Sequence, residues 1–142
     1  MSTIPQKIQL ARDLGATRIL LERRDQALEI AALSSSPVSA ERARHTSNIG
    51  QQIGALALRF SALYPEQMGI AKDLIEAGNT VSSKAGKMSM MAADNVRYGS
   101  NWGSALDAPC AAMAAAVDAI YADVEKQAFV KPSDNNASIS SF

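Results

Sequence analysis

The chain has 142 residues, with 14 basic and 14 acidic side chains that balance to a formal net charge of zero. This length suits one domain, and the balanced charge gives neither half of the chain the basic surface typical of nucleic-acid-binding proteins. The single cysteine excludes an intramolecular disulfide, and no apolar run reaches the ~20 residues of a membrane span, so we expect a soluble cytoplasmic protein. Abundant alanine and few aromatic residues favour an all-α fold.

A long first helix is predicted over residues 5–33. Pro5 is acceptable in a first helical turn, and leucines recur along one side of the segment at near-heptad spacing. These leucines are Leu10, Leu14, Leu21 and Leu28. The polar run at residues 34–37, which ends in proline, predicts a break.

A second helix is predicted over residues 39–63, with Ser39 as its N-cap and Tyr64-Pro65 as its stop. One face of this helix carries bulky apolar residues: Ile49, Ile53, Leu56, Phe60 and Leu63. The neighbouring face carries small ones: Ala43, Ser47, Gly50, Gly54, Ala57 and Ser61. A glycine inside a helix costs on the order of 1 kcal/mol relative to alanine. We therefore expect another helix to approach closely along the small face.

Two shorter helices are predicted next, over residues 65–77 and 81–96, with a turn at Gly78-Asn79. Residues 67–91 faintly resemble the helix-turn-helix of DNA-binding proteins, with Ala71 as the small residue between the helices and Gly78 as the turn glycine. That glycine stands about three residues later than in the motif, and the second helix offers only Lys84 and Lys87 to phosphates. The resemblance implies DNA binding, although the few basic side chains predict weak phosphate attraction.

A turn-rich loop at residues 97–103 holds the only tryptophan. Three of its residues, Tyr98, Asn101 and Trp102, are candidates for contact with a ligand or a partner, because amphipathic aromatic side chains on a turn are common contact anchors. The alternative is that Trp102 closes one end of the bundle.

The last helix is predicted over residues 104–129, and its segment 108–117 contains no charged residue. A helix without a polar face must be covered on every side. Its small residues, Ala108, Ala112, Ala115 and Ala119, follow the same alternating spacing as those of the second helix. The matching small faces predict that the second and last helices pack against each other or against copies of themselves.

Residues 130–142 form a polar tail beyond the domain at residues 1–129. The tail has linker composition but carries the apolar residues Ile139 and Phe142. We expect these two side chains to contact another subunit or a partner.

Catalytic and metal-binding residue types are scarce. His45 and Cys110 are the only members of their kinds, whereas a zinc site normally needs three or four ligands and acid-base catalysis needs a positioned partner. The standard glycine-rich nucleotide motifs do not occur. We therefore expect no metal, no cofactor and no enzymatic activity.

Together these patterns predict an elongated helical bundle with three long and two shorter helices. Its expected role is that of a non-enzymatic structural or assembly subunit or adaptor, bound to copies of itself or to other subunits, as in a phage virion or a secretion apparatus. One alternative is a small regulator or inhibitor that binds DNA or a protein. Another is a ligand-binding or enzymatic bundle that uses the loop around Trp102.

Overall fold

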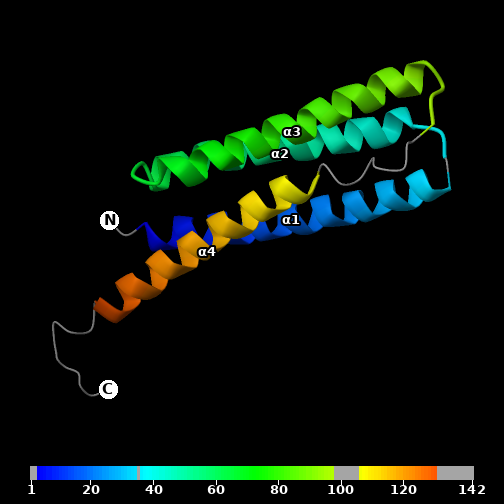
Figure 1. Ribbon diagram of the computed structural model, residues 1–142. Helices are drawn as coiled ribbons and strands as arrows, with labels where there is room; N and C mark the ends of the chain where they lie inside the picture. Colours follow the sequence, from blue (N-terminus) through cyan, green and yellow to red (C-terminus); the bar gives the residue numbers. More distant parts are fainter. Residues whose placement is uncertain (1–2, 35, 98–105, 131–142) are drawn as a thin grey trace.

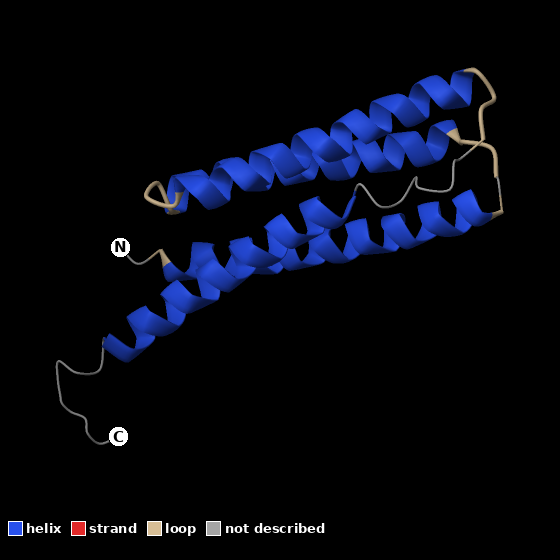
Figure 2. Ribbon diagram, in the orientation of Figure 1, coloured by secondary structure: helices blue, strands red, loops and turns tan. Residues whose placement is uncertain are grey.

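The computed structural model describes residues 3–34, 36–97 and 106–130, and these residues form an all-α bundle (Figures 1 and 2). Its helices are α1 (Ile4–Leu33), α2 (Ala40–Leu63), α3 (Met68–Ala93) and α4 (Asp107–Val130). Between the described residues no strand forms, and the only pairing of that kind is an isolated bridge between Pro37 and Arg97. The predicted all-α bundle is confirmed.

The four helices run alternately up and down, and each packs on two neighbours. The pair α2 and α3 forms a tight antiparallel hairpin, while α4 lies across α1 and α3 (Figure 1). In consequence α1 stands diagonally opposite α3, and α2 stands diagonally opposite α4. None of the helices in the described part of the chain is long and apolar enough to cross a membrane.

The predicted limits of the first two helices are confirmed to within one residue. Pro5 occupies the first turn of α1. Ser39 has an extended backbone and its hydroxyl accepts a hydrogen bond of 3.2 Å from the backbone N–H of Arg42, which is the geometry of an N-cap. At the other end of α2, Tyr64 precedes Pro65 and leaves the helical conformation.

The predicted break at Gly78-Asn79 is wrong, because α3 continues through both residues. The reason is a buried apolar face that repeats every three or four residues across this point and packs on α2; Leu74, Ala77, Val81, Ala85 and Met88 belong to it. This burial outweighs the poor helix propensity of glycine and asparagine. Since the helix has no turn here, the helix-turn-helix resemblance at residues 67–91 is wrong as well.

The end of α3 is set by Asn95, which has a φ of +56°. The backbone N–H of Val96 donates to the Met91 carbonyl at 2.9 Å, and that of Asn95 donates to the Ala92 carbonyl at 3.3 Å. This is the Schellman pattern, in which a left-handed residue closes a helix. The helix therefore stops three residues before the predicted limit at Val96.

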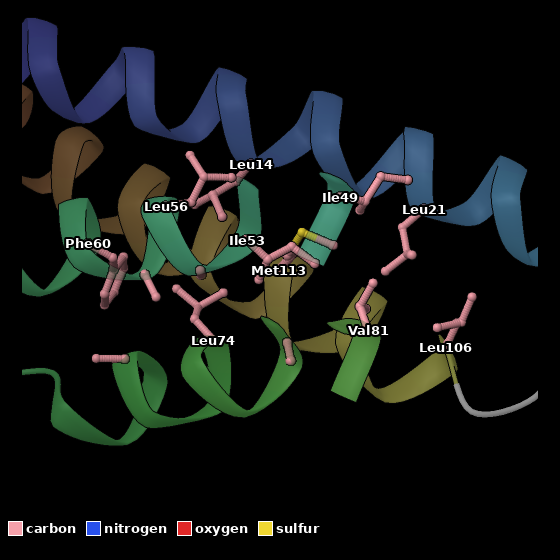
Figure 3. Packing of buried hydrophobic residues seen from close by; sticks show 14 of the residues in the cluster. Leu14, Leu21, Ile49, Ile53, Leu56, Phe60, Leu74, Val81, Leu106 and Met113 are labelled. Atoms are coloured by element: carbon pink, nitrogen blue, oxygen red, sulfur yellow. The ribbon is translucent and has the colours of Figure 1, made fainter. Parts of the chain in front are cut away.

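The core lies along the axis where the four helices face one another. Side chains from all four elements converge there, among them Leu14, Ile53, Leu74 and Met113, each fully buried (Figure 3). The bulky face predicted for the second helix supplies much of this core, since Ile49, Ile53, Leu56 and Phe60 are buried. One continuous apolar cluster thus holds all four helices together.

Candidate interaction surfaces

The backbones of α2 and α3 come close together at Gly50, Gly54 and Gly78. A Cβ atom placed on Gly78 of α3 would lie 3.2 Å from the Gly54 nitrogen and 3.3 Å from the Gly50 carbonyl oxygen of α2. A Cβ atom on Gly50 would lie 3.0 Å from the Ser82 nitrogen and would overlap the Ser82 hydroxyl. At Gly54 the same atom would meet nothing within 4 Å. The glycines therefore let the α2 and α3 backbones touch, and the space is tightest at Gly50 and Gly78.

The small face of α2 is thus used against α3, with Ala57 also buried. The prediction that the second and last helices pair within the chain is wrong, because α2 and α4 are diagonal in the bundle. Two features explain the difference: the connection at residues 64–67 is too short to place another element between α2 and α3, and Gly78 supplies the matching small residue. Pairing of these faces between copies stays a prediction.

The alanine-rich face of α4 is partly open. Met113, Ala116 and Ile120 are fully buried against the bundle, whereas Ala108 and Ala115 are exposed and Ala112 and Ala119 are half-buried. Among the described helices only α1 and α3 pack on α4, so the described part of the chain does not cover this charge-free segment on every side, contrary to what the sequence led us to expect. Alanine makes this tolerable, because each methyl group exposes little apolar surface.

A groove runs between α3 and α4 along this open face. It encloses about 370 Å³, and its α4 side consists of Ala108, Pro109, Ala111, Ala112 and Ala115. Its α3 side carries Asp73, Glu76 and Thr80, all three exposed. The groove, called the α3/α4 groove below, is therefore apolar on one side and acidic on the other.

A polar cluster ties α4 to the end of the bundle where α1 begins and α2 ends. The Asp123 carboxylate accepts hydrogen bonds from Lys7 Nζ at 2.9 Å, from the Tyr64 hydroxyl at 2.8 Å and from Gln127 Nε2 at 3.1 Å. Lys7 Nζ also stands 4.9 Å from the centre of the Tyr64 ring. Each polar side chain of the cluster is bonded to another member, and these bonds join α1, the end of α2 and α4. The cluster therefore serves to hold three helices together.

Protonation in this cluster follows from its contacts. Burial raises the pKa of the Asp123 carboxyl, but the hydrogen bonds from Lys7, Tyr64 and Gln127 and the charge of Lys7 outweigh it, so this pKa lies below its ordinary value of 3.8. Burial, aided by the hydrogen bond to Asp123, raises the pKa of the Tyr64 phenol. Asp123 is thus an anion and Tyr64 a neutral donor near neutral pH. Sequence reasoning missed this cluster because Lys7 and Asp123 are 116 positions apart.

His45 and Cys110 lie on different helices. His45 is exposed on α2, where Arg24 Nη2 approaches its Nδ1 to 3.4 Å, and Cys110 is half-buried on α4. Within residues 3–34, 36–97 and 106–130, no three His, Cys, Asp or Glu side chains gather in a way that could hold a metal ion. The absence of catalytic and metal-binding roles stays a prediction.

Five of the proposed contact residues lie outside the described part of the chain. These are Tyr98, Asn101 and Trp102 in the loop before α4, and Ile139 and Phe142 in the tail. Their proposed contacts stay predictions, as does the alternative of a ligand pocket at Trp102. Comparison of the chain with protein-family models, curated proteins and solved structures gives no match.

Proposed function

We propose that this chain is a non-enzymatic helical subunit of a larger protein assembly and that it acts through helix packing. The observation that carries the proposal is the open, charge-free face of α4 beside the α3/α4 groove. A helix whose sequence has no charged residue from 108 to 117 is suited to burial on more sides than one chain provides.

The chemistry of that face fits a protein partner. Alanine has no side-chain rotamers to order, so packing another helix against it loses little conformational entropy. Small residues also let a second backbone come near, as Gly50 and Gly78 do inside the chain. Other exposed apolar side chains add to the available surface, among them Leu58 at 71% and Met68 at 75% exposure.

The setting of this assembly is proposed from composition alone. A single cysteine and balanced charge suit a particle or complex formed in the cytoplasm. Virion components of phages and parts of secretion systems are typical examples of such helical chains. Fold and composition favour no one of these settings over the others.

The proposal is tested by size-exclusion chromatography of a fresh lysate of the cells that produce the chain, with immunodetection across the fractions. We expect the chain to elute far ahead of the position for a 15.0 kDa protein. After the assembly is dissociated with mild denaturant and dialysed into dilute buffer, we expect the chain to elute at that position. Elution of the whole population as a 15.0 kDa monomer from a concentrated lysate would contradict an assembly role.

A further inference from the structure

We infer that the α3/α4 groove of one molecule receives the outer face of α1 from a second copy of the same chain, so that molecules associate head to tail. The inference rests on the proposed assembly role and names its partner. It starts from two surfaces, an acidic one on α3 and α4 and a basic one on α1, that match in charge, side-chain size and spacing.

The first surface is the α3/α4 groove with its rim. On α4, Asp107 stands one residue before Ala108 and Asp118 three residues after Ala115; both are exposed and lie beyond the residues that line the groove itself. On α3, Asp73 and Glu76 add two more exposed carboxylates along the same groove. None of these four takes part in an ion pair with another described side chain. Together these four carboxylates contribute a negative potential to this face of the molecule.

The second surface is the outer ridge of α1, formed by Arg12, Ala16, Ile19 and Arg23. Spacings of four, three and four place these residues on one side of the helix, and all four are exposed, Ile19 at 45%. Like the rim carboxylates, Arg12 and Arg23 form no ion pair with a described side chain. The ridge thus offers two cations with an apolar section between them.

The two surfaces share one spacing. Arg12 and Arg23 are 11 residues apart, as are Asp107 and Asp118, and 11 residues correspond to about three helical turns or about 16 Å. When both arginines face both aspartates, Ala16 and Ile19 lie over Ala111 and Ala115 of the groove. The apolar section of the ridge then covers the open alanines, and the charges meet at both ends.

A contact between two different surfaces of one chain is heterologous and can repeat. Each molecule that docks its ridge still presents its own groove, so association produces rings or growing chains of copies. Charge complementarity at the rim steers the two surfaces together and opposes other registers.

The test uses charge reversal and sedimentation velocity over a concentration series. One variant reverses the ridge (Arg12→Glu with Arg23→Glu), and another reverses the groove (Asp107→Lys with Asp118→Lys). Like charges would then face each other, so we expect each variant to associate at least about tenfold more weakly than the wild-type chain. A matched control, Arg44→Glu with Lys87→Glu, reverses two exposed cations elsewhere and should associate as the wild-type chain does.

The decisive variant combines all four reversals in one chain. Its formal net charge stays at zero, as in the wild-type chain, and the two reversed positions of the ridge again face groove positions of opposite charge. We expect association to return to the wild-type level, with unchanged helix content by circular dichroism in every variant. A monomeric wild-type chain at every concentration, insensitivity to either reversal, or failure of the combined variant to recover would each overturn the inference. The lysate experiment would still report separately on assembly with other proteins.

Discussion

The contact between the α2 and α3 backbones can be tested by comparing two glycine substitutions in the same helix. Gly78→Ala places a methyl group 3.2 Å from the Gly54 nitrogen and 3.3 Å from the Gly50 carbonyl, whereas Gly86→Ala places it where no other atom lies within 4 Å. Alanine improves helix propensity by about 1 kcal/mol at both sites. At Gly78 overpacking against rigid backbone opposes this gain by about 1 to 3 kcal/mol.

We therefore expect Gly86→Ala to raise the free energy of unfolding by about 1 kcal/mol and Gly78→Ala to lower it by up to about 2 kcal/mol. The assay is urea denaturation followed by far-ultraviolet circular dichroism. The slope of the free energy of unfolding against urea concentration is held at the wild-type value for both variants. The difference in the free energy of unfolding between the two variants isolates the interhelical contact, since the gain in helix propensity is the same in both and cancels. Equal stabilisation by both substitutions would refute the close approach of α2 and α3.

Substitutions at three further positions test other parts of the bundle. Asp123→Asn leaves Lys7 without its anionic partner and should destabilise the chain by about 1 to 3 kcal/mol at pH 7. Because folding lowers the pKa of Asp123, the stabilisation by its carboxylate is fully present above the ordinary carboxyl pKa of 3.8 and is lost as the pH falls further. The stability difference between this variant and the wild-type chain should therefore shrink as the pH is lowered below 3.8 in urea titrations, and a pH-independent difference would argue against the ion pair. Met113→Ala should cost about 2 to 5 kcal/mol in the same assay because it empties a fully buried site, and a cost near zero would contradict the placement of α4. Asn95→Ala should cost about 1 kcal/mol, since alanine tolerates the left-handed conformation poorly, while Asn95→Gly should not; equal effects would contradict the Schellman end of α3.

Local signals allowed much of the fold to be predicted. Ser39 and Pro65 limit α2 through chemistry that acts within a few residues, and the leucines Leu10, Leu14, Leu21 and Leu28, all fully buried, mark the inner side of α1. These features do not depend on which helix lies opposite. For that reason the fold class and the limits of the first two helices were predictable from the sequence.

Features that depend on the identity of the neighbour were not predictable in the same way. The local sequence around Gly78 predicts a helix end. The requirement for glycine at this position comes instead from the backbone of α2, since a Cβ atom here would press against Gly50 and Gly54. The same lack of information led to the wrong partner for the small face of α2. Lys7 and Asp123 likewise show no local sign of their contact, because it forms only when the ends of α1 and α4 are brought together.

For the candidate surfaces, sequence reasoning identified the alanines of α4 but not the carboxylates beside them. Asp73 and Glu76 belong to another helix, and their alignment with Ala111 and Ala115 requires the packing of α3 on α4. The complementary ridge on α1 could be recognised only when its residues were known to be exposed.

Head-to-tail docking between two copies of the chain is tested most directly by disulfide trapping. In a Cys110→Ala background, one variant carries Ile19→Cys on the ridge, and a second carries Ala111→Cys or Ala115→Cys in the groove. Under mild oxidation, we expect a mixture of ridge and groove variants to form a cross-linked species of twice the 15.0 kDa chain mass on a non-reducing gel, while each variant alone does not. No cross-link in either mixture, or equal cross-linking in each variant alone, would contradict head-to-tail docking of α1 into the α3/α4 groove.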